Sequence, residues 1–275
     1  MSVLLAVDGD SFAHRAYHGL PKTIRGEGGR PANAIVGFAS MLSRLWEAES
    51  PDAVIVGWDT LEVPTYRHLA FEAYQTGRHF DPELLDQLPV LPRFAEACGF
   101  VSARAPGYEA DDFLAAAAAA GEAGGGTVLV ATSDRDAFQL ASERTTILQH
   151  VRGVSELARI GPAEVRERYG VEPGQVPDFI ALRGDPSDRL PGAKGVGPKT
   201  AAAILAEYGS LEGALDAGRF AGQAEELRLY RRIATLVASA PLPSQAQPSP
   251  TWAEASLFLR QLGLNAAADR LAALT

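Results

Sequence analysis

The stretch Thr127-Val128-Leu129-Val130-Ala131-Thr132-Ser133-Asp134-Arg135-Asp136 joins an uncharged, largely apolar run to a pair of aspartates. Small and β-branched side chains without an interrupting charge are typical of a strand that is buried on both faces of a sheet. The aspartates follow where that strand would end. The stretch therefore predicts a buried strand with acidic side chains beyond its carboxyl end, where α/β proteins commonly bind their ligands.

Three further runs of this kind occur elsewhere in the chain. Val3–Val7 directly precedes Asp8, and Ala53–Gly57 is followed closely by Asp59. A weaker run covers Thr146–Leu148. Helical stretches separate the runs, namely Ala32–Glu49, about Pro82–Cys98, and Ala110–Ala123. Strands that alternate with helices predict an α/β fold, with a mostly parallel central sheet flanked by helices on both faces.

The second part of the chain shows no strand signal after about Pro162. We expect helices over Ala163–Tyr169, Val176–Arg183 and roughly Ala253–Leu262. An exposed connection is expected over Ala240–Ser249, which is rich in proline, serine and glutamine. The length of 275 residues suits one large domain or two smaller ones. We divide the chain into an α/β part, 1–168, and a helical part, 169–275.

The composition is that of an ordinary globular protein, with 47% hydrophobic and 21% charged residues. No apolar run is long enough to span a membrane, and the N-terminus lacks the basic leader of a signal peptide. The single cysteine, Cys98, excludes an internal disulfide and is expected to be a small buried apolar residue. These features predict a cytoplasmic protein with no membrane partner, and we take a monomer as the default.

The net charge of −9, from 25 basic and 34 acidic residues, at first argues against a nucleic-acid partner, because phosphate binding needs positive charge. The argument weakens if the acids gather at one site where metal ions neutralise them. Setting aside the nine acids described next leaves as many acidic as basic residues. Local basic patches could then bind DNA with modest, salt-sensitive affinity.

Nine carboxylates fall into groups that the predicted sheet and the following loops would bring together. They are Asp8, Asp59, Glu109, Asp111, Asp112, Asp134, Asp136, Asp185 and Asp188. Each group alone has an ordinary explanation, because acids in the first turn of a helix favour its dipole and aspartates commonly cap helices or form turns. Together, however, crowded carboxylates repel one another and would not all ionise unaided.

Divalent cations would offset that repulsion. Mg²⁺ and Mn²⁺ prefer oxygen ligands, and one cysteine with five scattered histidines offers no competing soft site. Two ions about 4 Å apart suit in-line attack of water on a phosphodiester. One ion helps to generate hydroxide, and both stabilise the charge on the transition state and the leaving oxygen. The acids therefore predict a two-metal phosphodiester hydrolase.

Taken in order, the acidic motifs resemble those of a known family. The motifs are Val7-Asp8-Gly9, Gly107-Tyr108-Glu109-Ala110-Asp111-Asp112, Thr132-Ser133-Asp134-Arg135-Asp136, Gly184-Asp185-Pro186-Ser187-Asp188 and Leu190-Pro191-Gly192. They resemble the bacterial 5′-nucleases, which are flap endonucleases and the 5′–3′ exonuclease domain of bacterial DNA polymerase I. The resemblance spans nearly the whole chain, and no polymerase follows, so the sequence looks like a stand-alone exonuclease.

The resemblance implies a PIN-like nuclease core that hydrolyses DNA with a free 5′ end, as exonuclease and flap endonuclease, in repair or replication. It also implies that all nine carboxylates take part in catalysis by binding two Mg²⁺ or Mn²⁺ ions. One ion would draw on Asp8, Asp59, Glu109, Asp111 and Asp112. The other would draw on the four remaining aspartates, with Asp111 near both.

A glycine-rich hairpin, within about 185–208, resembles the helix–hairpin–helix element of these nucleases. Its candidate DNA contacts are Lys194, Gly195, Gly197, Lys199 and Thr200. The glycines let the backbone approach a phosphate, the amides of the following helix face it, and the lysines add charge. The resemblance also implies a K⁺ ion at the hairpin carbonyls. The alternative is an ordinary turn between two helices.

A further match, over about 62–95, resembles the flexible helical arch that covers the active site and admits single-stranded 5′ DNA. Arg67 and Arg78 are its candidate phosphate ligands, with Arg78 also counted as catalytic, and Tyr74 is the candidate for base stacking. Arg15, together with Tyr17, matches the family's spacing after the first acidic motif and is a candidate substrate contact. The alternative is an amphipathic surface helix.

The sequence departs from the family pattern at Gln75, where a lysine commonly helps to neutralise the scissile phosphate. Glutamine forms hydrogen bonds but carries no charge. Arg78 or Lys22 could substitute for it, and a smaller departure is Arg189, where asparagine is common. Two alternatives therefore stay open: a branched-DNA-binding protein with weakened catalysis, and an RNase from the related acidic-site nucleases.

Overall fold

The computed structural model describes residues 2–60, 62–77, 79–152, 156–244 and 250–274. A six-stranded sheet in the order β3-β2-β1-β4-β5-β6 forms its centre. The strands are β1 Val3–Asp8, β2 Ala53–Gly57, β3 Val101–Ala103, β4 Thr127–Thr132, β5 Thr145–Arg152 and β6 Glu156–Ile160. All neighbouring strands are parallel except β5 and β6. The predicted mostly parallel α/β fold is therefore confirmed.

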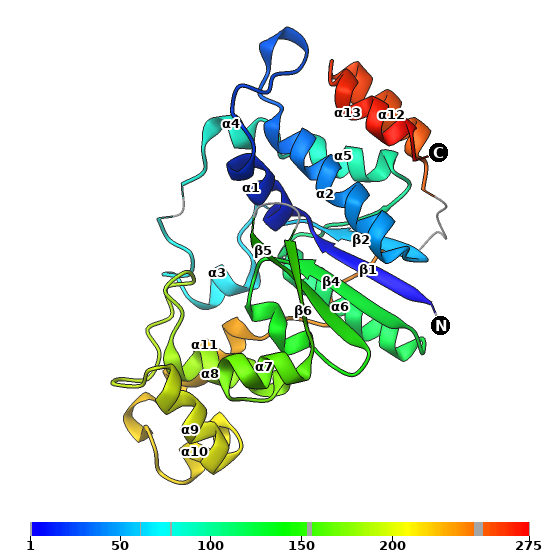
Figure 1. The fold of residues 1–275 in the computed structure, drawn as a ribbon. Helices are drawn as coiled ribbons and strands as arrows, with labels where there is room; N and C mark the ends of the chain where they lie inside the picture. Colours follow the sequence, from blue (N-terminus) through cyan, green and yellow to red (C-terminus); the bar gives the residue numbers. More distant parts are fainter. Residues whose placement is uncertain (1, 61, 78, 153–155, 245–249, 275) are drawn as a thin grey trace.

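Alternate residues of the buried strands face opposite layers of helices. Leu5 and Val7 of β1 pack into a core with α1, α2, α5, α12 and α13, whereas Leu4 and Ala6 pack into a core with α6 to α11. The strand period of two residues thus assigns one hydrophobic layer to each face. Figure 1 shows the two layers on either side of the sheet.

The helices of the first layer and of the arch region are as follows. They are α1 Gly9–Gly19, α2 Asn33–Glu49, α3 Tyr66–Ala70, α4 Pro82–Leu85 and α5 Val90–Ala97, with a short 3₁₀ turn η1 at Glu27–Gly29. The helix expected over about 82–98 is therefore wrong as a single element, because it breaks before Pro89. Proline cannot donate a backbone hydrogen bond inside a helix, and α5 begins anew after it.

The second layer and the helical part contain α6 Ala110–Ala123, α7 Pro162–Tyr169, α8 Val176–Arg183, α9 Pro198–Tyr208, α10 Leu211–Asp216 and α11 Ala224–Ala234. Three 3₁₀ turns join them, η2 Asp136–Leu140, η3 Pro173–Gln175 and η4 Ala221–Gln223. In Figure 1, α9 and α10 form a separate lobe at the end farthest from the sheet.

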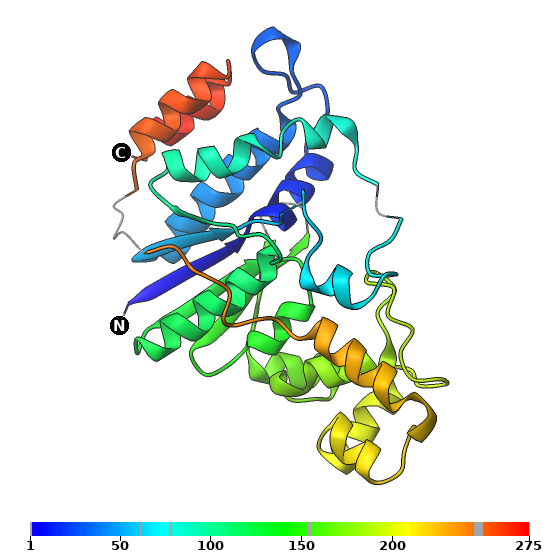
Figure 2. The ribbon, with the colours of Figure 1, turned by 180° about the vertical axis from the view of Figure 1, so that it is seen from behind.

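The chain then returns to the sheet. After α11 it runs back across α6, as Figure 2 shows from behind, and ends in α12 Trp252–Gln261 and α13 Asn265–Ala272. These two helices pack on α5 and α2, respectively, although the predicted division places them in the helical part at 169–275. Of the expected connection over 240–249, residues 245–249 lie outside the described residues. None of the described helices is long and apolar enough to cross a membrane.

Strand register brings the predicted acids to one edge. In the parallel ladders Val7 lies level with Val56 of β2 and with Ala131 of β4. The carboxyl ends of β1, β2 and β4 therefore finish side by side, and the loops that follow them carry acidic residues. α6 lies close to the same edge of the sheet. A Cβ added to Gly57 would lie only 2.6 Å from the carbonyl oxygen of Ala110.

Candidate active site

One cavity of about 880 Å³ opens at the carboxyl edge of the sheet. Eight of the nine predicted acids line it together with one that the sequence analysis missed; the full set is Asp8, Asp10, Asp59, Glu109, Asp111, Asp134, Asp136, Asp185 and Asp188. Asp112 is absent from this lining. The strands, the start of α6 and the loop after α8 thus bring together carboxylates from distant parts of the chain.

Asp8 is fixed at the junction of β1 and α1. Its Oδ1 accepts from the backbone N–H of Ser11 at 2.9 Å, and its Oδ2 accepts from Thr132 Oγ1 at 2.7 Å. Burial raises the pKa of Asp8 to about 7, and the nearby carboxylates of Asp59 and Asp134 add to the effect. A carboxylate that is this costly to ionise is suited to a cation partner.

Asp10 and Asp59 form a relay into α6. Asp10 accepts from the backbone N–H of Asp59 at 2.7 Å, and Asp59 Oδ1 accepts from the backbone N–H of Ala110 at 2.8 Å. Burial, and then the charge of Asp59, raise the pKa of Asp10 well above its usual range. The available sequence signal for Asp10 was its place two residues after Asp8. In the sequence, however, Asp10 looks like an ordinary acid in the first turn of a helix.

Glu109 and Asp111 lie at the start of α6. Glu109 accepts from Thr65 Oγ1 at 2.8 Å and from the hydroxyl of Tyr74 at 2.9 Å. Asp111 lies 3.5 Å from the guanidinium of Arg67, yet its buried Oδ1 has no hydrogen-bond donor among the described residues. This oxygen therefore has the charge of Arg67 beside it but accepts no hydrogen bond from the described residues, which leaves a buried acceptor incompletely satisfied.

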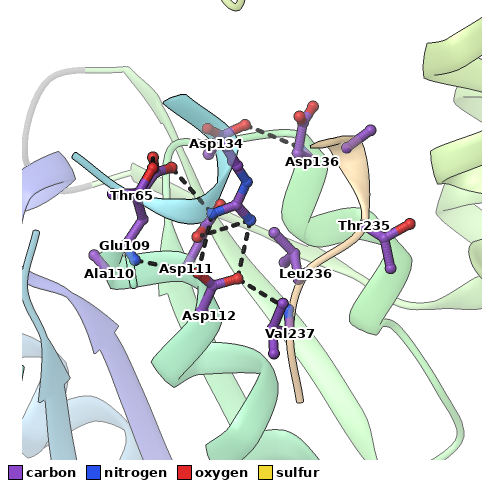
Figure 3. A network of polar contacts seen from close by, with 12 residues as sticks. Thr65, Glu109, Ala110, Asp111, Asp112, Asp134, Asp136, Thr235, Leu236 and Val237 are labelled. Atoms are coloured by element: carbon purple, nitrogen blue, oxygen red, sulfur yellow. Dashed lines mark hydrogen bonds and ion pairs between the residues drawn. The ribbon is translucent and has the colours of Figure 1, made fainter. Parts of the chain in front are cut away.

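Asp112 corrects the predicted ligand set. Its side chain is fully buried and accepts from Arg67 at 2.9 and 3.0 Å, from the N–H of Val237 at 2.9 Å and from the N–H of Glu109 at 3.1 Å. These donors occupy both of its oxygens, and Figure 3 shows the contact with Val237. The expectation that Asp112 binds a metal ion does not fit this placement.

Two of the predicted DNA contacts, Arg67 and Tyr74, line the cavity, but protein groups occupy their polar atoms. Arg67 is only 1% exposed and Tyr74 only 3% exposed, so neither offers a charge or a ring face to bulk solvent. Their polar atoms turn to Glu109 and its neighbours instead. The third candidate of the arch, Arg78, lies outside the described residues.

Gln75 links the two groups of acids. Its Nε2 donates to the hydroxyl of Tyr74 at 2.7 Å and to Asp188 Oδ1 at 3.1 Å, while Tyr74 in turn donates to Glu109. The residue that replaces the expected lysine therefore does face the cavity. Lys22 instead pairs with Asp81 at 2.6 Å and is absent from the cavity lining, so it does not take the place of that lysine.

The remaining acids come from the loops after β4 and α8. Asp134 is exposed, and its Oδ1 accepts from the N–H of Asp136 at 2.9 Å. Burial, and then the charges of Asp134, Asp188 and Asp185, raise the pKa of Asp136 well above its usual range. Asp185 accepts from the N–H of Ser187 at 2.8 Å and from Arg183 at 3.2 Å.

The donor chemistry of the cavity fits hard divalent ions, since its acids offer only oxygen ligands. Within the described residues no three His, Cys, Asp or Glu side chains form a complete metal-binding group by themselves. Mg²⁺ bound to proteins usually keeps several water molecules and takes further ligands from a bound phosphate. Asp111 Oδ1, which accepts no hydrogen bond among the described residues, is one candidate ligand atom.

The predicted DNA contacts outside the arch lie in two places. Arg15 lines the cavity and donates from Nε to Ser133 Oγ at 3.0 Å. The hairpin residues Lys194, Gly195, Gly197, Lys199 and Thr200 are all exposed; the first three lie between α8 and α9, and the last two lie in the first turn of α9. Gly195 has φ +77°, a left-handed conformation that favours glycine, and α9 begins with its N-terminus at the hairpin.

A cavity of oxygen ligands at the carboxyl edge of a mostly parallel sheet, together with an exposed glycine hairpin in the helical part, defines a nuclease with an acidic active site. The chain belongs to the 5′-3′ exonuclease family. The family's N-terminal resolvase-like domain matches residues 3–170, and its C-terminal SAM fold matches residues 171–253. This membership does not favour the alternative of a DNA-binding protein with weakened catalysis.

Curated relatives agree with the family. DNA polymerase I of Mycobacterium tuberculosis is 44% identical over 215 residues, which is 78% of this chain and 24% of the polymerase. DNA polymerase I of Deinococcus radiodurans is 43% identical over 210 residues, or 76% of this chain and 21% of that protein. The chain thus matches only about a quarter of the length of these relatives.

Solved structures share the fold. T5 5′-exonuclease with bound zinc ions has a TM-score of 0.69 at 17% identity and covers 98% of both chains. The catalytic core of Rad2 in complex with DNA substrate has a TM-score of 0.60 at 16% identity, covering 98% of this chain and 91% of that one. Human GEN1 in complex with Holliday junction DNA has a TM-score of 0.64 at 12% identity, covering 98% and 71%.

Proposed function

We propose that the protein hydrolyses phosphodiester bonds of DNA that carries a free 5′ end, as a 5′–3′ exonuclease and flap endonuclease. The observation that carries the proposal is the convergence of eight predicted acids and Asp10 in one cavity. Several of these carboxylates are buried and repel one another, which favours a site built for cations.

Two divalent ions, Mg²⁺ or Mn²⁺, are the proposed cofactors. When bound, such ions supply a water that is nucleophilic at neutral pH and stabilise the charge on the leaving oxygen. Asp8, Asp59, Glu109 and Asp111 would hold one ion. The second would be held by Asp134, Asp136, Asp185 and Asp188. Thr132 and Ser11 orient Asp8, while the relay from Asp10 through Asp59 keeps the start of α6 in place.

The DNA would be held by groups on both sides of the cavity. The exposed lysines and amides of the 194–200 hairpin suit the phosphates of a duplex, and a K⁺ ion at the hairpin carbonyls would add charge there. Arg15 lies beside the acids and is the proposed contact within the cavity. Residues 62–95, including Arg78, would cover the single-stranded 5′ end.

DNA complexes of structural neighbours support a DNA substrate. The matches to DNA polymerase I support a role in replication or repair. We propose that the protein acts as a monomer in the cytoplasm.

Cleavage of a labelled 5′-flap duplex tests the proposal. We expect release of the flap with Mg²⁺ or Mn²⁺, and much slower cleavage when the 5′ end is blocked by a bulky group. A flap of RNA in the same duplex distinguishes the RNase alternative. Intact binding without cleavage at any concentration of either ion would contradict the proposal.

A further inference from the structure

The guanidinium of Arg67 joins three segments that are far apart in sequence. Nε donates to the carbonyl of Ile233 at the end of α11 at 2.9 Å, and Nη1 donates to Glu109 at 3.2 Å. Nη1 and Nη2 also donate to both oxygens of Asp112, at 3.0 and 2.9 Å. One buried group thus holds α3 of the arch, the start of α6 and the end of α11 together.

Contacts around this pair extend the junction to the segment 233–237. Asp112 accepts from the N–H of Val237 at 2.9 Å. Tyr66 lies with its ring 4.6 Å from the Arg67 guanidinium and donates from its hydroxyl to the carbonyl of Thr235 at 3.1 Å. Figure 3 shows Glu109, Asp111 and Asp112 on one side of the junction and 235–237 on the other.

We propose that Arg67 and Asp112 are a pair of positioning residues that tie the helical part to the acidic cavity. Arg67 donates to Glu109 and pairs with Asp111, and Asp112 accepts from Arg67 and from the N–H of Val237. Since α11 packs on α8 and α8 leads into the hairpin, DNA bound at the hairpin would act on the same helices that position the carboxylates. The inference rests on the proposed nuclease function.

Energetic cost makes a passive role for this pair a poor explanation. Burying two charges carries a large desolvation cost that their attraction must offset, and apolar residues often replace such pairs without loss of stability. A bidentate pair with further hydrogen bonds does, however, fix orientation sharply. Substitution of a group that holds a metal ligand in place without touching the metal typically changes metal affinity or activity by about tenfold to a hundredfold.

Kinetics of Arg67→Met, Asp112→Asn and the double variant test the proposal. We expect each single variant to lower kcat about tenfold to a hundredfold and the double variant to lower it no further, because both remove one junction. The dissociation constant for DNA and its salt dependence should stay unchanged. Arg159→Met, which breaks the exposed pair with Glu49, is the matched control and should cleave normally.

Two kinetic outcomes would overturn the inference. Weaker DNA binding with a smaller salt dependence in Arg67→Met would make Arg67 a phosphate ligand. Multiplied effects in the double variant would make the two residues independent of each other.

Hydrogen exchange on the metal-free full-length chain gives a second readout that needs no activity. In Asp112→Asn and in the milder Arg67→Lys, the amides of 66–71 and of 235–237 should lose protection together, while those of β1 and β4 keep it. Loss of amide protection in only one of the two segments would overturn the proposed coupling. If Arg67→Met loses protection throughout the described residues, Asp112→Asn and Arg67→Lys still decide the test. If both segments lose protection together in the variants but the wild type cleaves no flap substrate, the proposed function is refuted and the structural link is kept.

Discussion

The two sides of the acidic cavity balance their charge in different ways. At the start of α6 the carboxylates of Glu109, Asp111 and Asp112 surround Arg67, whose side chain is 2% exposed. On the opposite side, Asp185 meets Arg183, whose side chain is 23% exposed, and Asp188 meets the neutral amide of Gln75. One side carries its own buried cation, and the other depends more on ions from solution.

This difference separates structural acids from reactive ones. A carboxylate whose two oxygens both accept from a buried arginine, as those of Asp112 do, has little left to offer a ligand, and removing its charge leaves the arginine buried without a full partner. Carboxylates that mainly face each other destabilise the metal-free fold and gain most from a divalent ion. Asp112 and Asp136 represent the two cases, and substitutions at these positions should act in opposite directions on stability.

The largest expected effect belongs to Asp136→Asn. Removal of this charge should lower the cleavage rate about a thousandfold, because one proposed ion loses a ligand. The metal-free variant should melt about 3 °C higher than the wild type, since repulsion from Asp134, Asp185 and Asp188 is relieved.

Asp112→Asn is the matched opposite, and its metal-free form should melt several degrees lower, because it leaves Arg67 buried beside one fewer charge. Differential scanning fluorimetry with a chelator measures both shifts. If Asp136→Asn and Asp112→Asn shift the melting temperature by the same amount in the same direction, the two sides of the cavity do not differ in how they balance charge.

Gln75→Lys should make the charge balance of the two sides of the cavity more alike. A lysine within reach of Asp188 adds a cation where the described contacts now include a neutral amide. We expect cleavage to rise by about tenfold, because the charge would also face a bound phosphate. Single-turnover rates on a flap substrate measure the gain, with the exposed Gln261→Lys on α12 as the control. A slower enzyme would mean that the hydrogen bond from Gln75 to Asp188 matters more than charge.

A smaller effect concerns the pH dependence of stability through Asp8. Its pKa is about 7 in the folded protein against an ordinary value of 3.8, so the folded state binds more protons between these values. Stability from this group is therefore lost as pH rises from about 4 to about 7. Without metal, the melting temperature of the wild type should fall relative to Asp8→Asn across that window. A constant difference between the two proteins would contradict it.

The sequence predicted the sheet better than the arch. β2 and α6 match their expected bounds, because an uncharged β-branched run and an alanine-rich helix with acidic residues in its first turn are strong local signals. β3 and β6 were missed, since short edge strands carry little periodicity. The break before Pro89 could have been read from the proline itself.

The sequence predicted which acids belong to the site better than it predicted what each of them does there. Strand ends located Asp8, Asp59 and Asp134 at one edge without knowledge of any contact. The roles of Asp112 and Arg67 depend on a partner more than a hundred residues away, at 233–237. No local pattern carries such information, because it arises only when α11 packs against α3 and the segment after α11 reaches Asp112 of α6.

The central claim is that the acids of this cavity drive metal-dependent cleavage of DNA. Single-turnover cleavage of a 5′-flap duplex by wild type and Asp134→Ala, over a titration of Mg²⁺, tests it most directly. We predict no cleavage in chelator, a rise with Mg²⁺ for the wild type, and a loss of at least about a hundredfold for Asp134→Ala with flap affinity retained. Cleavage that persists in chelator, or an Asp134→Ala protein as fast as the wild type, would contradict the account.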